Sequence, residues 1–489
     1  MNEDKKESDN LLTTNFIPKE HTMISIVDEE QEDEIFEQNR KMYTYSNPNY
    51  AQLRHLSHVR KLPFFRRLFR PMEDGSLRAV VIVWIRMTMG IGILTTPYYI
   101  SSFGVLGGVL ALLIGAILCL MSFRFIFEAS VERKQKEFLS LISDLLPEFI
   151  SRVFKYTFLL DLMIPLLSYL IISWNIFSYI LYMFGLFHDD WVINVDTMEI
   201  DEYNKWVFLI RAGYFFLVFL FLIPLFMKKD LSSLRSISFV FLGVMVVFLI
   251  YIMVESPFFR VAYKRNDTLK VNYLIKPLEP YFIPNFFSML LAFYIQPFVL
   301  TLRNEVISPT ISRLRKISFY TILVEFLIYA VFGSICYLCF GDNYIPALMI
   351  LRKPYEGKNY ISEVIFKGGI VLFFILIVLG LSVFNPGIRD HALKFSTMKN
   401  KSLQYKLYSL VPFFIACLIG TLVPNIITVF WFFGLVVCNF NGFIIPVLLK
   451  IQLINLKGRS FVKLVLCYLL LLFYVLCGAF GVFVKLSGN

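Results

Sequence analysis

The sequence predicts an all-α integral membrane protein with eleven transmembrane helices. Of its 489 residues, 57% are hydrophobic and only 17% are charged, whereas soluble domains carry about 45–50% apolar and about 25% charged residues. The mean hydropathy is +0.66. The apolar residues are gathered into runs of the roughly 20 residues that a helix needs to cross a bilayer. This composition argues against a soluble enzyme and excludes a disordered chain.

Eleven apolar segments are long enough to span a membrane. They cover residues 78–101, 104–127, 154–184, 206–227, 236–255, 282–302, 317–340, 363–385, 407–423, 425–449 and 461–484. Residues 1–77 precede them and are polar and charged, so we expect a cytosolic, largely disordered N-terminal tail. Residues 78–489 then form the transmembrane domain.

The charges of the loops predict how the chain is oriented in the membrane. Cytosolic loops carry an excess of Lys and Arg, and here the excess lies on the side of the N-terminal tail. An odd number of spans then places the C-terminus on the extracellular or lumenal side. Asn266, in the sequon Asn266-Asp267-Thr268, falls in an outer loop, which predicts N-glycosylation at that residue.

Two of the eleven segments contain residues that interrupt a helix. In the first segment, Gly90 and Gly92 lie near mid-membrane and Pro97 follows them. Glycine weakens a helix by about 1 kcal/mol relative to alanine, and proline by about 3 kcal/mol. In the sixth segment, Pro297 interrupts the helix directly after Gln296. Unwound backbone at this depth is tolerated only where it is buried or lines a cavity.

The two interrupted segments occupy corresponding positions in the chain. They are five segments apart and cross the membrane in opposite directions, as an inverted repeat of five helices requires. Residues 78–255 would form one repeat and 282–449 the other, with 461–484 as an extra helix. Paired interrupted helices of this kind mark the substrate site of many transporters. The alternative is that Gly90 and Gly92 only allow close packing of helices.

The first interruption has the chemistry to bind a zwitterion. The helix that restarts after Gly92 presents free N–H groups and the positive end of its dipole, which favour a carboxylate. Unwound carbonyl groups on the other side can accept hydrogen bonds from an ammonium group. The pattern therefore favours a substrate that carries both charges.

The same residues resemble the amino acid/auxin permease family, whose members are similar in fold to the LeuT-type transporters. Residues 90–98 read G-I-G-I-L-T-T-P-Y, which is similar to the family pattern G-x-G-I-L-x-x-P-Y. Further matches lie in the sixth segment, at Ala292, Phe293, Pro297, Val299, Leu300 and Glu305. Gln296 stands where the family commonly has His, and Thr301 where it has a second Pro. The resemblance covers residues 78–450.

This resemblance implies a LeuT-type fold and a secondary active transporter of amino acids. It implies that the substrate carboxylate lies at Gly90, Ile91 and Gly92. The residues implied for the rest of the substrate site are Thr88, Thr95, Phe293, Tyr294 and Gln296. The apolar character of Met89, Ile91 and Phe293 favours neutral amino acids. An amino acid sensor, or a non-coupled facilitator on the same fold, is the alternative function.

Three ionisable residues inside the predicted spans are candidates for coupling or gating. Arg86 lies four residues before Gly90, where sodium-coupled relatives often have Asn. Its permanent positive charge would repel Na⁺, so we expect transport that is proton-coupled or uncoupled rather than sodium-coupled. Asp161 and Glu325 are the candidate partners of Arg86, either in proton coupling or in a salt bridge that closes the inner gate.

The sequence contains no motif that indicates an enzyme. Neither a G-x-S-x-G nor a Walker motif occurs, and no clustered His, Asp or Cys residues suggest a metal site. We therefore expect no catalytic residues, no cofactor, no metal and no nucleic-acid binding. The expected partners are an amino acid, protons and the lipid bilayer. An acidic dileucine pattern at residues 7–12 favours an endolysosomal or vacuolar membrane over the plasma membrane.

Overall fold

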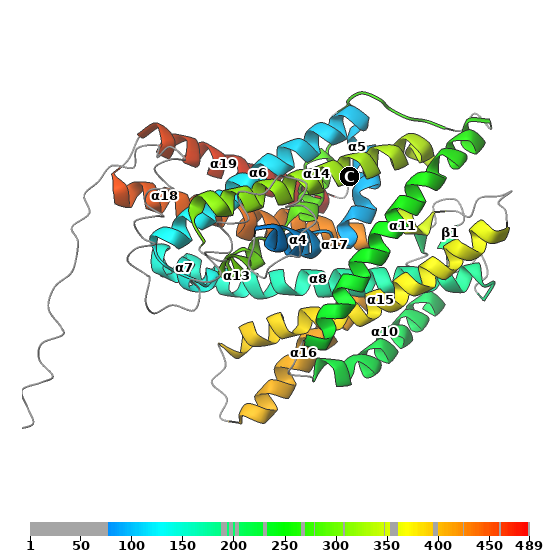
Figure 1. Ribbon diagram of the computed structural model, residues 1–489, viewed down its shortest axis with the longest axis horizontal. Coiled ribbons are helices and arrows are strands. Elements are labelled where there is room, and N and C mark those ends of the chain that lie inside the picture. Colours follow the sequence, from blue (N-terminus) through cyan, green and yellow to red (C-terminus); the bar gives the residue numbers. More distant parts are fainter. Residues whose placement is uncertain are drawn as a thin grey trace, which may run out of the picture. The chain divides into compact units, whose positions relative to one another are not determined.

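The computed structural model describes most of the chain after the predicted tail. The described residues are 77–186, 193–194, 199–200, 205–227, 232–265, 269–277, 279–306, 309–346, 348–352, 360–394, 400–423, 425–458 and 461–487. The predicted disorder of the tail and the sequon at Asn266 therefore lie outside the described residues. The described part is almost entirely helical (Figure 1). It also contains an antiparallel pair of two-residue strands, β1 (Ile193–Asn194) and β2 (Glu199–Ile200).

Ten helical segments among the described residues are long and apolar enough to cross a membrane, so the protein is a multi-pass membrane protein. Six are the long helices α6 (Val105–Glu132), α8 (Glu148–Met183), α10 (Lys205–Phe226), α11 (Ser232–Arg265), α14 (Ile311–Tyr344) and α15 (Tyr360–Leu393). Two more are α16 (Lys401–Leu422) and α19 (Phe461–Leu486). The remaining two are composite segments, Phe282–Glu305 and Ile426–Lys457.

The first of the eleven predicted spans is not among these ten, because its helix is interrupted. Helix α4 (Leu77–Thr88) ends before Met89, the 3₁₀ helix η1 (Ile91–Thr95) follows, and α5 (Thr96–Phe103) completes the segment. Each piece is shorter than the roughly 20 residues of a spanning helix. Pro97 stands at the start of α5, where a missing N–H costs no helical hydrogen bond. We call residues 89–95 the first break.

The segment Phe282–Glu305 is also interrupted. It consists of α12 (Phe282–Leu290), the 3₁₀ helices η2 (Leu291–Phe293) and η3 (Gln296–Phe298), and α13 (Val299–Glu305). Between the two 3₁₀ helices, Tyr294 has an extended backbone with φ −82° and ψ 109°. Pro297 explains this position, because its ring lacks an N–H and clashes with the carbonyl group four residues earlier. We call residues 291–298 the second break.

The segment Ile426–Lys457 contains a π-helix between two α-helices. Helix α17 (Ile426–Phe432) leads into the π-helix η5 (Phe433–Ile444), and α18 (Ile445–Lys457) follows. Such wide turns inside α-helices occur frequently at functional sites. Here the π-helix packs against α8 and α12.

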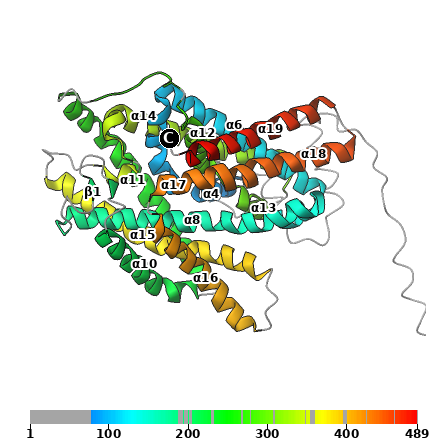
Figure 2. The same cartoon turned by 180° about the vertical axis from the view of Figure 1, so that it is seen from behind.

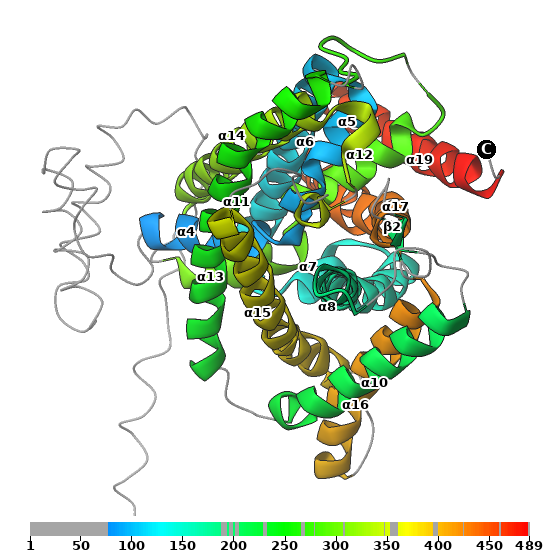
Figure 3. The ribbon, with the colours of Figure 1, turned by 90° about the vertical axis from the view of Figure 1, so that its right-hand side faces the viewer.

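The spanning segments form two groups that pack together. Helices α8, α10, α15 and α16 contact one another, and so do α4, α5, α6, α12 and α14. Figures 1, 2 and 3 show the first group, with α8 and α15 running side by side, next to the second group with α6 and α14. Helix α8 and the π-helix η5 lie where the groups meet, and both breaks lie there too.

Candidate functional site

The two breaks lie against each other inside the membrane-spanning part. The 3₁₀ helices η1 and η2 are in contact, and a Cβ atom added to Gly92 would lie 3.7 Å from Ala292 Cα. Backbone of both interrupted segments therefore meets at one place. Both residues belong to turns in which the α-helical hydrogen bonding has stopped.

Close helix packing does not account for Gly90 and Gly92. A Cβ atom added to Gly90 would have its nearest neighbours at 3.8 Å, an ordinary van der Waals distance. By contrast, a Cβ atom at Gly434 would lie 2.8 Å from Phe287 O, and one at Gly442 only 2.5 Å from a ring carbon of Tyr294. The tight-packing glycines are thus Gly434 and Gly442, while the first break has room for an added methyl group.

Backbone groups at the first break form hydrogen bonds outside the regular α-helical pattern. The Gly90 N–H donates to Thr88 O at 2.6 Å, and the Thr95 hydroxyl donates to Gly92 O at 2.7 Å. The N–H groups of Ile91 and Gly92 begin a new helix, so they have no acceptor within it. They are suitable donors for an anion, and the resemblance to the amino acid/auxin permease family implies that the substrate carboxylate lies at these residues. The Ile91 side chain lies outside the part that the structure describes.

Tyr329 of α14 connects the two breaks. Its hydroxyl donates to Ala292 O at 2.9 Å and lies 3.5 Å from Thr88 O. Its ring packs against Phe293 with a centroid distance of 5.2 Å, and both side chains are fully buried. Sequence reasoning missed Tyr329, although it lies one helical turn after Glu325 and so shares a face with it.

Glu325 lies against the first break. The Thr88 hydroxyl, at the end of α4, is hydrogen-bonded to Glu325 Oε1 and lies 2.9 Å from Trp84 O. Glu325 is fully buried. Its Oε2 atom has no hydrogen-bond partner among the described residues. A carboxyl group and a residue of the predicted substrate site are therefore in direct contact.

Asp161 of α8 lies against the second break. Its Oδ2 atom accepts from the Tyr294 hydroxyl at 2.5 Å and from Asn441 Nδ2 at 3.1 Å. Asn441, in the π-helix, in turn accepts from the Thr157 hydroxyl at 2.8 Å. Asp161 is buried, and no described residue pairs with its Oδ1 atom. The two acids thus contact different breaks, and the sequence had not indicated the contact with Asn441.

Two predicted residues remain, Gln296 at the second break and Arg86 on α4. Gln296 is fully buried, and its side-chain carbonyl accepts from the Ile295 N–H at 3.0 Å, so it satisfies backbone that has left the helix. The Arg86 side chain lies outside the described residues, and its pairing with Asp161 or Glu325 stays a prediction. In the part of the chain that the structure describes, no group of three or more His, Cys, Asp or Glu could hold a metal ion.

A buried ion pair anchors the segment that contacts the first break. The 3₁₀ helix η4 (Met349–Leu351) contacts η1, and Arg352, which follows it, forms an ion pair with Glu255 of α11. The guanidinium group lies 3.9 Å from the Phe366 ring centroid, and the Tyr179 hydroxyl donates to Arg352 O at 2.6 Å. Burial lowers the pKa of Arg352 to about 10, so it stays charged at neutral pH.

Comparison with known proteins identifies related sequences. Residues 73–488 match the sequence model of a family described as transmembrane amino acid transporter protein. A Plasmodium falciparum protein named as an amino acid transporter, AAT1, is 20% identical over 60% of this chain and 44% of its own length. Vacuolar amino acid transporter 5 of Saccharomyces cerevisiae is 24% identical over 62% of this chain and 64% of its own length. The chain thus spans less than two thirds of the length of either relative.

Among solved structures, a manganese transporter of Eremococcus coleocola is similar in outline. It is 12% identical, with a TM-score of 0.47, over 85% of this chain and 87% of the other.

Proposed function

Because the chain belongs to the transmembrane amino acid transporter family, we propose that it carries amino acids across a membrane by binding them between the two breaks. The observation that carries this proposal is the meeting of the broken backbones at Gly92 and Ala292. Backbone that has left helical pairing inside a membrane must be buried in protein or line a cavity. Two such stretches side by side provide donors and acceptors for a small polar molecule.

The chemistry of the breaks fits a zwitterion. The N–H groups of Ile91 and Gly92 would hold the carboxylate, assisted by the positive end of the helix dipole. Carbonyl groups of the unwound residues would accept from the ammonium group. The rest of the proposed site comprises Thr88, Thr95, Phe293, Tyr294 and Gln296. Phe293 is buried within the second break, and an apolar side chain there favours neutral amino acids.

We further propose that residues 77–103 cross the membrane as an eleventh, interrupted span within a LeuT-type inverted repeat. The packing of the helices supports this arrangement. Helices α6, α8 and α10 contact α14, α15 and α16 respectively, which are their counterparts five spans later. Helix α11 contacts α14 and α15, and the segment Ile426–Lys457 correspondingly contacts α6 and α8. If each helix is replaced by its counterpart in the other repeat, the same helix contacts result.

Protons are the coupling ion that the buried groups support best. A protonated Glu325 would donate to the Thr88 hydroxyl, which could then donate to Trp84 O, its neighbour at 2.9 Å. Release of that proton would change the hydrogen bonding at the end of α4, where the first break begins. Asp161 has the same capacity at the second break. We place Arg86 as the fixed cation that takes the place of Na⁺.

The membrane we propose is endolysosomal or vacuolar. The yeast relative is named as vacuolar, and the acidic dileucine pattern of the tail agrees with such a location. In this arrangement the N-terminus is cytosolic, the C-terminus faces the lumen or the outside, and Asn266 is glycosylated.

Uptake into liposomes tests the proposed transport. The full chain is reconstituted and offered a panel of radiolabelled amino acids, with Na⁺ or choline and with or without a proton gradient. We expect saturable uptake of at least one neutral amino acid that persists in choline and rises with the gradient. Glu325→Gln should lose the response to the gradient, and the exposed Glu148→Gln should keep it.

Two results of this assay would contradict different parts of the proposal. Abolished uptake in choline would overturn the proposed independence of Na⁺. Binding of an amino acid without any flux would overturn transport and indicate a sensor.

A further inference from the structure

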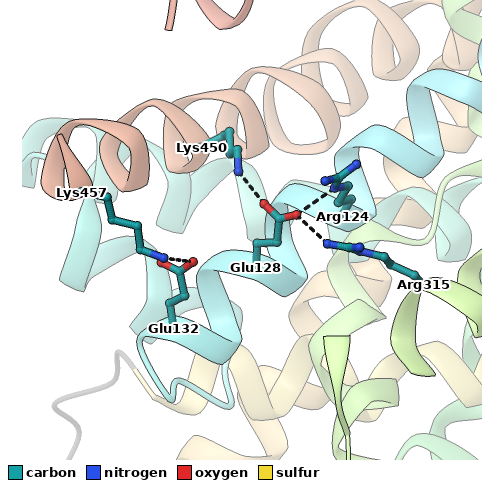
Figure 4. A network of polar contacts seen from close by, with 6 residues as sticks. All are labelled: Arg124, Glu128, Glu132, Arg315, Lys450 and Lys457. Carbon is teal, nitrogen blue, oxygen red and sulfur yellow. Dashed lines mark hydrogen bonds and ion pairs between the residues drawn. The ribbon is translucent and has the colours of Figure 1, made fainter. Parts of the chain in front are cut away.

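A cluster of charged side chains lies at one end of α6, α14 and α18. Glu128 of α6 accepts from Arg124 Nε at 2.8 Å, from Arg315 of α14 at 3.2 Å and from Lys450 Nζ of α18 at 2.5 Å. Lys457 forms an ion pair with Glu132 beside them. Figure 4 shows both guanidinium groups on one side of the Glu128 carboxylate and the Lys450 amine on the other. Four cations face two carboxylates, so the cluster has excess positive charge.

The two arginines are exposed although their shared carboxylate is not. The Glu128 side chain is only 10% exposed, whereas those of Arg124 and Arg315 are 56% and 48% exposed. A guanidinium group has five N–H donors, and each of these contacts with Glu128 uses one nitrogen atom. Both groups therefore have donors left for a ligand outside the helix bundle.

The surface around the arginines is one that lipid would cover. Arg124 continues a stripe of exposed apolar side chains on α6, formed by Leu106, Leu110, Leu113 and Ile117. Eighteen residues separate Leu106 from Arg124, which is five turns of an α-helix. Arg315 lies one turn before Phe319, which begins an exposed stripe on α14 with Leu323 and Leu327. Helices α6 and α14 are packed neighbours, so both stripes end at the cluster.

We propose that Arg124 and Arg315 bind the phosphate of an anionic phospholipid. The planar guanidinium fork matches phosphate oxygens in pairs, and the apolar stripes would hold the acyl chains. Glu128 is a positioning residue that holds the two guanidinium groups side by side. The loop charges place this end of α6 in the cytosolic leaflet, which is the negatively charged one.

Thermal unfolding in defined lipid tests this site. The full chain is placed in nanodiscs of phosphatidylcholine, alone or mixed with phosphatidylserine, and Tm is measured. We expect phosphatidylserine to raise the Tm of the wild type and not that of the double variant R124Q/R315Q. The matched control R133Q/R152Q removes the half-exposed Arg133 just after α6 and the exposed Arg152 at the start of α8, and should keep the shift. If the double variant does not fold, Arg124→Gln alone should reduce the shift.

Two results would overturn the proposal. One is a phosphatidylserine-induced rise in Tm that is as large in R124Q/R315Q as in the control. If only Arg124→Gln folds, the same comparison is made with that variant. The other is an equal shift of the wild type with water-soluble glycerophosphoserine, which would show that a free phosphate, and not a lipid, occupies the cluster.

Discussion

The substitution Tyr329→Phe tests whether one hydroxyl group holds the two breaks in register. The hydroxyl donates to Ala292 O at 2.9 Å and lies 3.5 Å from Thr88 O. Phenylalanine keeps the ring that packs against Phe293 and removes only the oxygen atom. The perturbation is therefore confined to the contacts that the hydroxyl makes with Ala292 O and Thr88 O.

The size of the effect follows from the environment of the lost bond. An unsatisfied buried acceptor costs about 1–3 kcal/mol in soluble proteins, and hydrogen bonds between membrane helices reach about 1.7 kcal/mol at most. Ala292 O lies within the second break and not in a regular α-helix, so we expect a loss of about 1–1.7 kcal/mol. This corresponds to a fall in kcat/KM of roughly 5- to 18-fold.

The assay is the initial rate of amino acid uptake into liposomes as a function of substrate concentration. Tyr320→Phe is the matched control, because Tyr320 lies on the same helix with an exposed side chain, and it should transport like the wild type. Tm values of both variants show whether they fold. Wild-type kcat/KM in Tyr329→Phe would refute the role of the hydroxyl group.

Three further changes probe other contacts. Glu325→Gln keeps a hydrogen-bonding side chain and loses the titration, so uptake should no longer respond to pH; an unaltered pH profile of uptake would contradict proton coupling at this residue. Gly442→Ala puts a Cβ atom 2.5 Å from the Tyr294 ring, an overpacking of about 1–3 kcal/mol that should lower uptake. Gly213→Ala, with open space around it, should leave uptake unchanged, and equal uptake by the two variants would refute this packing argument. Arg352→Met removes the cation that pairs with the buried Glu255 carboxylate and should lower the free energy of unfolding by about 3–5 kcal/mol, measured by denaturant unfolding. An unchanged free energy of unfolding would show that this ion pair does not stabilise the fold.

The helical architecture follows from local properties of the chain. Long apolar runs predict the spanning helices, and the family follows from short motifs near Gly90 and Pro297. The structure ends α4 at Thr88, two residues before Gly90, and places the extended residue Tyr294 three residues before Pro297. Helix-breaking residues act on their immediate neighbours, which is why a single sequence indicates where a helix stops.

The contacts of the buried acids could not be predicted in the same way. Sequence reasoning proposed Asp161 and Glu325 as partners of Arg86, but their described contacts include Thr88 for Glu325, and Tyr294 and Asn441 for Asp161. Thr88 and Glu325 are 237 residues apart in the chain. Which residues meet over such a separation depends on how whole helices pack, and a single sequence has no local signal for that.

Substrate protection of a cysteine introduced by Gly90→Cys tests the site between the breaks most directly. A Cβ atom at this position would have its nearest neighbours at 3.8 Å, so the side chain should be tolerated. Six of the seven native cysteines are buried and Cys477 is half-buried, which keeps background labelling by a small polar thiol reagent low. We predict that a transported amino acid slows labelling of the variant as it saturates uptake. An unchanged labelling rate in a variant that still takes up that amino acid would contradict a substrate site at the first break.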